Sequence, residues 1–133
     1  MNGGASMRSV RTETWAMSAA ILALVGACAD KGDLPRRLAG ADPERGRAII
    51  EDVSCAACHT IPGVAWPRGR VGGALAGFAH RTLIAGQLPN QPDILVRWLR
   101  DAPSLSPETG MPAIPLTEAE ARDIAAYLYT LDD

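Results

Sequence analysis

Apolar residues recur at the spacing of an α-helix in three parts of the chain, and irregular stretches separate them. The members of the three stripes are Ala48, Ile49 and Val53; Ile94, Leu95, Trp98 and Leu99; and Ile124, Tyr127, Leu128 and Leu131. No segment has the alternating pattern of a half-buried strand, and no internal repeat is present. The pattern therefore predicts an all-α fold with three main helices joined by long loops.

Each predicted helix has a recognisable start. Asp42 precedes a proline, which suits an N-cap followed by the first helical position. Asn90 is predicted to cap the second helix, with Asp93 three residues later. Thr117 and Glu120 have the spacing of a capping box ahead of the third helix, which is predicted to run to the C-terminus.

The loops between these helices are unusually long for a small domain. Residues 60–79 are rich in Gly and Pro and have no period. A stretch of that length without regular structure is uncommon in a compact domain unless it serves a function. The folded part, residues 42–133, contains the single Phe and both Tyr of the chain, so it is expected to need a cofactor to complete its core.

The N-terminus has the features of an export signal. Arg8 and Arg11 precede the apolar run of residues 15–29, which is shorter than the roughly 20 residues of a membrane-spanning helix. Residues 25–28, Val-Gly-Ala-Cys, resemble the lipobox of bacterial lipoproteins. We therefore expect a signal peptide over residues 1–27 and a lipid on Cys28. An uncleaved short anchor, or ordinary cleavage that leaves a free cysteine, is the alternative.

The remaining organisation follows from that export signal. Residues 28–41 are expected to form the lipid attachment and a polar tether, and residues 42–133 the folded domain. The protein is expected on the periplasmic side of a bacterial membrane, held there by its lipid. The chain has a net charge of −2 and a single lysine, Lys31, without any basic run, so a nucleic-acid partner is not expected.

Residues 55–59, Cys-Ala-Ala-Cys-His, carry the strongest chemical signal. Zinc would need a fourth ligand, a redox disulfide usually lies in a βαβ setting, and a cysteine nucleophile needs a separate histidine base. His80 is the only other histidine of the chain. Covalent haem attachment uses Cys55, Cys58 and His59 together, because two thiols can bind the two vinyl groups while the imidazole binds the iron.

A second axial ligand is expected if the haem serves electron transfer. Met111 is the only methionine beyond the predicted signal peptide, and it lies on a Pro-flanked loop where no core stripe would place it. A lone methionine is more often a core residue than a ligand. Met111 is nevertheless the preferred distal ligand, and His80 is its rival.

These motifs resemble those of class I c-type cytochromes, in particular small bacterial monohaem proteins, over nearly all of residues 42–133. The resemblance implies the cytochrome c fold, with loops wrapped around one covalent haem c and its iron. It also implies that Gly46 lets the first helix cross the last one closely, near Tyr127. The family usually has a Gly-Pro pair after the haem motif; here the carbonyl of Gly73 is expected to accept the proton of the proximal histidine ring.

The resemblance implies three further haem contacts. Arg81 and Thr109 fall where the family contacts a haem propionate, and Trp98 falls where an aromatic ring packs near the methionine sulfur. A propionate-binding tryptophan of mitochondrial relatives has no counterpart, since Asn90 occupies that position. Trp66 is expected either to replace it or to cap the loop.

The function implied is that of a single-electron carrier rather than an enzyme, in a respiratory chain that feeds a terminal oxidase. Redox proteins are therefore the expected partners. The alternatives are a haem-c subunit of a dehydrogenase or oxidase complex, and a haem enzyme with an open coordination site.

Overall fold

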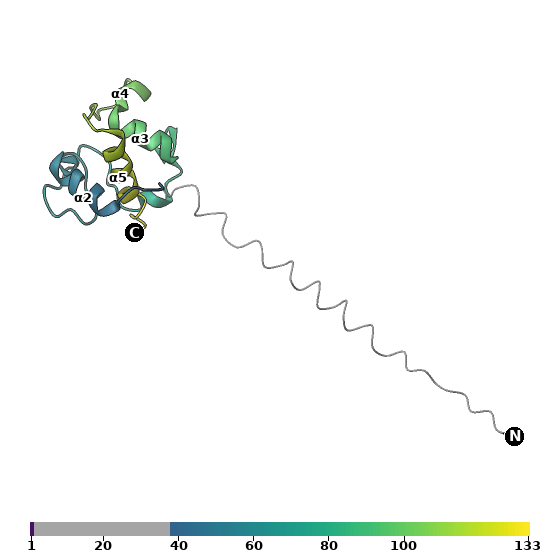
Figure 1. Ribbon diagram of the computed structural model, residues 1–133. Coiled ribbons are helices and arrows are strands. Elements are labelled where there is room, and N and C mark those ends of the chain that lie inside the picture. The colour runs from purple at the N-terminus through teal and green to yellow at the C-terminus, as the bar shows by residue number, and fades with distance from the viewer. Residues whose placement is uncertain (2–37) are drawn as a thin grey trace. The chain divides into compact units, whose positions relative to one another are not determined.

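The computed structural model describes residue 1 and residues 38–133 (Figure 1). All described elements belong to one unit, Asp33–Asp133. The predicted signal peptide, the predicted lipidation site Cys28 and the tether up to residue 37 lie outside the described residues. The last residues of the tether form a turn, in which the Ala41 amide donates to the Leu38 carbonyl at 3.1 Å.

Three main helices lie where the apolar stripes predict them: α2 (Pro43–Asp52), α3 (Pro92–Arg100) and α5 (Glu118–Leu128). The remaining elements are short and were not predicted. They are the helix α4 (Ala102–Leu105), the 3₁₀ turns η3 (Cys55–Ala57) and η4 (Phe78–His80), and an antiparallel pair of two-residue strands, β1 (Leu83–Ile84) and β2 (Leu88–Pro89). The predicted all-α class is confirmed. In the described part of the chain, no helix has the length and apolar character that crossing a membrane requires.

Two of the three predicted helix starts are confirmed. The Asp42 carboxylate accepts from the amides of Glu44 and Arg45 at 3.0 and 3.2 Å. Thr117 and Glu120 form the predicted capping box. The C-terminal prediction was wrong, because α5 ends at Leu128, five residues before the end of the chain.

The predicted cap of the second helix was also wrong. Gln91 occupies the N-cap position of α3, without a side-chain hydrogen bond. The buried Asn90 amide instead donates to the carbonyls of Phe78 and Arg81, at 3.3 and 2.9 Å, and its oxygen accepts from the Tyr129 hydroxyl at 3.0 Å. The reason is burial: a side chain that is 5% exposed needs partners for both its donor and its acceptor.

The close crossing of α2 and α5 at Gly46 is confirmed, with a shift in register. A Cβ at Gly46 would overlap the backbone of Asp123 and lie 2.8 Å from the Ile124 amide nitrogen. The contact is therefore one turn before Tyr127, the residue that we expected there. Tyr127 instead donates its hydroxyl to the Pro62 carbonyl at 2.7 Å, which ties α5 to the loop after the Cys-Ala-Ala-Cys-His motif.

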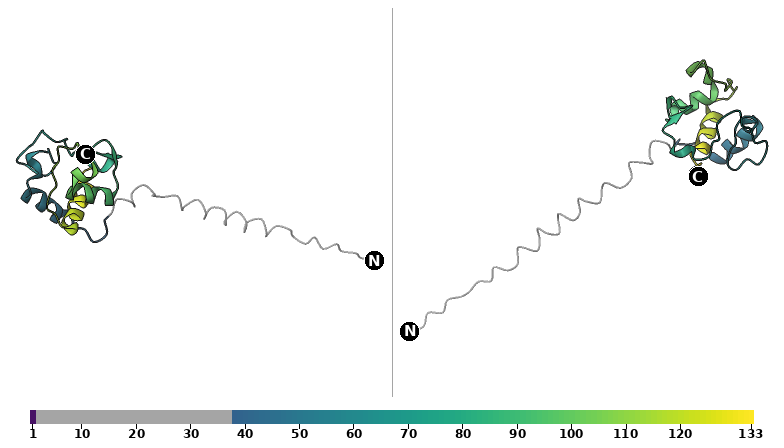
Figure 2. Two further views of the ribbon diagram at one scale, coloured as in Figure 1. Left: turned by 90° about the horizontal axis from the view of Figure 1, so that it is seen from above. Right: turned by 180° about the vertical axis from the view of Figure 1, so that it is seen from behind.

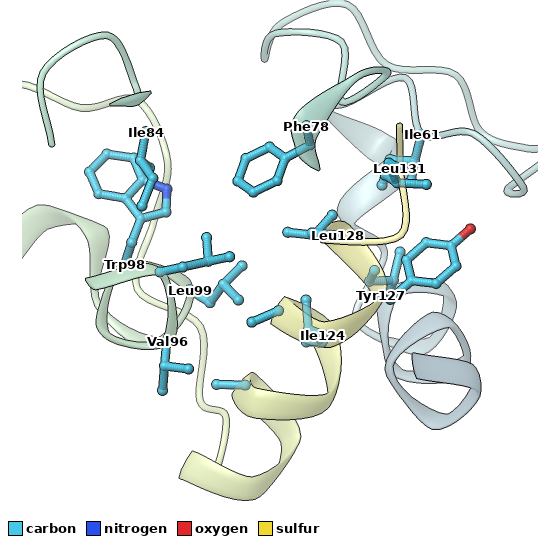
Figure 3. Close-up of a cluster of buried hydrophobic side chains, with 14 of the residues drawn as sticks. Ile61, Phe78, Ile84, Val96, Trp98, Leu99, Ile124, Tyr127, Leu128 and Leu131 are labelled. Carbon is cyan, nitrogen blue, oxygen red and sulfur yellow. The ribbon is translucent and has the colours of Figure 1, made fainter. Parts of the chain in front are cut away.

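Helix α5 contacts both α2 and α3, and the two further views agree with this arrangement (Figures 1 and 2). Its buried side chains face both neighbours. Figure 3 shows Trp98 and Leu99 of α3 on one side of the cluster, with Phe78 and the α5 residue Leu128 pointing toward them from the other side. The space between these side chains is the candidate site.

Candidate functional site

The turn after α2 places the two thiols differently. Ser54 adopts a left-handed conformation (φ 60°), and the chain then enters η3. The His59 amide closes the motif by donating to the Cys55 carbonyl at 3.0 Å. Cys55 is half-buried and Cys58 is exposed, so one thiol faces the interior and the other lies at its edge.

An apolar cavity of about 60 Å³ opens next to this motif. Cys55, His59 and Met111 all line it, although Met111 is more than fifty positions further along the chain. The other lining residues are apolar: Ile50, Ile61, Leu75, Phe78, Ile84, Leu95, Trp98, Leu99, Ile124 and Leu128.

Gly72 and Gly73 hold the ring of His59 in place. Its Nδ1 lies 2.7 Å from the Gly73 carbonyl, which is the contact that the resemblance implies. Because a carbonyl only accepts, Nδ1 carries the proton and the Nε2 lone pair is left for a metal. A Cβ on Gly72 would lie 2.6 Å from Nδ1 and 2.8 Å from Nε2, so Gly72 leaves no free space beside the ring. The role of Gly72 was not anticipated.

Met111 and Trp98 both line the cavity, and both come much later in the chain than the two thiols. The Met111 amide donates to the Thr109 hydroxyl oxygen at 3.2 Å, and this bond holds the backbone just before Met111. Trp98 is 7% exposed and lines the cavity. His80, the rival ligand, is exposed and is not among the residues that line the cavity.

The Arg81 side chain lies over residues 74–76, which flank Leu75 of the cavity lining. Its guanidinium donates to the carbonyls of Ala74 and Ala76, the latter at 3.1 Å. It also lies over the ring of Phe78, 5.7 Å from the ring centroid. The expected contact of Arg81 and Thr109 with a haem propionate therefore stays a prediction. Trp66 is 83% exposed, so it does not cap the loop, and its expected contact with a propionate stays a prediction.

Both thiols of the motif are free, as covalent attachment of a cofactor requires. Burial raises the pKa of the Cys55 thiol, so this group stays protonated at neutral pH. Among the residues that the structure describes, no three His, Cys, Asp or Glu side chains lie close enough to hold a metal ion, which a zinc site would need.

The residues present fit a c-type haem. An apolar cavity suits the porphyrin, two free thiols suit its vinyl groups, and a histidine with a fixed Nε2 lone pair suits the iron. The soft sulfur of Met111 lines the same cavity. None of these side chains is held in another interaction that excludes this role: the His59 bond to Gly73 leaves Nε2 available.

Comparison with known proteins gave three findings. The sequence model of the family "Cytochrome c" matches residues 43–132. Cytochrome c oxidase subunit 2 of Alkalihalophilus pseudofirmus is 36% identical over 88 residues, 65% of this chain, and the match spans only 25% of that relative's length. The crystal structure of SoxXA from P. pantotrophus superposes with a TM-score of 0.55, covering 70% of this chain and 83% of the other at 23% identity, which shows a shared fold.

Proposed function

Because the chain belongs to the cytochrome c family, we propose that it is a single-electron carrier in which His59 and Met111 are the axial ligands of the haem iron. The family binds haem c covalently, and the iron of this haem carries one electron by alternating between its ferric and ferrous states. The observation that carries the proposal is the cavity that Cys55, His59 and Met111 line together.

The residues of the chain have distinct roles in this proposal. Cys55 and Cys58 hold the haem through thioethers. The Gly73 carbonyl fixes the tautomer and orientation of His59, which also makes the imidazole a stronger ligand. The apolar lining and the methionine sulfur both favour the ferrous state, and so they raise the reduction potential. Arg81 and Thr109 remain candidates for the propionates, and Trp98 for packing against the Met111 sulfur.

A terminal oxidase is the proposed electron acceptor. The 36% identity of the chain to part of a cytochrome c oxidase subunit 2 supports this proposal, and the expected export of the chain agrees with it. The same likeness also fits a haem subunit within an oxidase or dehydrogenase complex, which is the second candidate. An open-site enzyme is disfavoured because the Met111 side chain lines the cavity.

Substitution of Met111 tests the ligand set. Ferric protein should show the weak long-wavelength band of a sulfur–iron bond. Met111→Ala should abolish the band, lower the potential and allow carbon monoxide or azide to bind. His80→Ala is the matched control and should change none of these. A shifted spectrum for His80→Ala would instead indicate two histidine ligands, and a wild-type protein that binds carbon monoxide readily would favour the open-site enzyme.

The domain boundaries and the lipid anchor are also proposals. We propose that residues 1–27 are removed, that Cys28 is acylated, and that residues 28–41 tether the domain of residues 42–133 to the periplasmic side of the membrane. Two or more acyl chains suffice for stable attachment. Mass spectrometry of the membrane fraction should find lipid on Cys28, whereas a soluble, unmodified mature form would remove the anchor.

A further inference from the structure

We propose that Arg100 is a positioning residue for the distal side of the haem: it holds the segment after Met111 on α3 and so keeps the methionine sulfur in the cavity. This inference rests on the proposed function, because it concerns the proposed ligand Met111. It depends on three observations: the hydrogen bonds on either side of Met111, the exposure of the residues next to it, and the place of Arg100 on the helix that lines the cavity.

Hydrogen bonds hold the backbone at two places around Met111. Before the sulfur-bearing side chain, the Met111 amide donates to the Thr109 hydroxyl at 3.2 Å. After it, the Ile114 amide donates to the Arg100 carbonyl at 3.0 Å. In the part of the chain that the structure describes, residues 112–113 between these two bonds form no hydrogen bond of their own. The position of Met111 therefore depends on both ends.

Side-chain packing adds little to the attachment of this segment. Gly110 and residues 112–113 are exposed, and the first buried side chain after Met111 is that of Leu116, which is 7% exposed. Segments with few buried contacts open locally at a lower free energy than the core of a protein. The hydrogen bonds at residues 114–116 should therefore control how often Met111 leaves the cavity.

Arg100 takes part in two of these bonds. Its carbonyl accepts from the Ile114 amide, and its side-chain Nε donates to the Leu116 carbonyl at 3.1 Å. The guanidinium is always protonated, so the second bond is charge-assisted and stronger than a neutral one. Arg100 is also the last residue of α3, and Trp98 of the same helix lines the cavity. The segment after Met111 is therefore held directly on a helix that forms part of the cavity wall.

Arg97 provides a matched control for charge. It lies one turn earlier on α3, is exposed, and lines the same surface depression as Arg100. Among the residues that the structure describes, its side chain has no hydrogen-bond or ion-pair partner. Arg97→Ala and Arg100→Ala remove the same charge, but only Arg100→Ala breaks the bond to the Leu116 carbonyl. Arg100→Gln removes the charge and keeps a donor, because the glutamine Nε2 is as many bonds from the backbone as the arginine Nε.

The test measures how fast imidazole binds to the ferric, haem-loaded protein. The sulfur–iron bond breaks, a nitrogen–iron bond forms, and the iron stays ferric, so at high imidazole the rate reaches a plateau set by the departure of Met111. Arg100→Ala should raise this plateau about fivefold, the factor expected for a hydrogen bond from an exposed charged group. Arg97→Ala should keep the wild-type plateau, and Arg100→Gln should lie close to it. Gly46→Ala, which disturbs the crossing of α2 and α5 instead, should leave the plateau unchanged.

Hydrogen exchange of the Ile114 amide, followed by NMR in the ferrous protein, is the second readout. Arg100→Ala should speed this exchange by a similar factor, and Arg97→Ala should not. Equal plateaus for Arg100→Ala and Arg97→Ala would overturn the proposal. So would a plateau for Gly46→Ala as high as that for Arg100→Ala, because the rate would then report general instability. A wild-type rate that rises with imidazole without any plateau would refute Met111 as the ligand, and exchange at Ile114 would still show whether Arg100 holds the segment.

Discussion

Gly72 is the residue whose substitution tests the site most sharply. An added Cβ would lie 2.6 Å from Nδ1 of His59 and closer still to its Cε1, against an ordinary contact of at least 3.4 Å, so the ring must retreat by at least about 0.8 Å. Ligand groups tolerate displacements of only about 0.5 Å. The adjacent Gly73 is the control, since a Cβ there meets no atom within 4 Å and neither glycine has a positive φ.

The expected magnitude follows from the hydrogen bond that the movement disrupts. The 2.7 Å bond from His59 to the Gly73 carbonyl is worth about 0.5–1.5 kcal/mol. If that amount is lost from the ferric state alone, the potential changes by about 20–60 mV, since about 1.4 kcal/mol corresponds to about 59 mV for one electron. The imidazole of Gly72→Ala donates less charge to the iron, so the potential should rise. Overpacking should also destabilise the protein by about 1–3 kcal/mol.

Two measurements check this prediction. A spectroelectrochemical titration gives the potential, and denaturant unfolding of the ferric protein gives the stability. Gly73→Ala should match the wild type in both. Identical results for Gly72→Ala and Gly73→Ala would refute the reasoning, because they would mean that the His59 ring does not lie against Gly72.

The remaining predictions concern the crossing of α2 and α5. Gly46→Ala should destabilise the fold by about 1–3 kcal/mol in denaturant unfolding, although alanine has the better helix propensity, because the added Cβ would overlap backbone that cannot move aside. The control is Ala48→Gly at an exposed position of the same helix, which should cost only about 1 kcal/mol. A Gly46→Ala variant that is more stable than the wild type would contradict the close crossing. The hydrogen bonds from Arg45 hold the pKa of the Asp123 carboxyl below its usual range, so this carboxylate contributes stability at neutral pH that is lost as the pH falls below about 4. Asp123→Asn should therefore be less stable than the wild type by about 1–3 kcal/mol at pH 7, with a difference that shrinks in acid; a constant difference across unfolding curves from pH 7 to pH 3 would exclude this linkage.

Contacts between residues far apart in the chain explain where the sequence-based predictions were wrong or incomplete. Asn90 has the residue type and the spacing of an N-cap. Only its buried hydrogen bonds to Phe78, Arg81 and Tyr129 show that it instead joins η4 to the end of α5. Asp123 interrupts the apolar face of α5, which was a visible signal for a buried carboxylate. Its partners, the Asp42 amide and Arg45, are about eighty positions earlier in the chain.

What the sequence determined by itself is local. Periodicity placed α2, α3 and α5, and residues 55–59 indicated the cofactor, because helix propensity, capping and the spacing of the two thiols act over only a few residues. The tertiary structure decided which distant groups meet. It placed Met111 in the same cavity as Cys55 and His59, and it put Gly72 against the imidazole. These contacts depend on how the helices pack and how the loops close over the cavity, and that packing is a property of the whole chain rather than of any one segment.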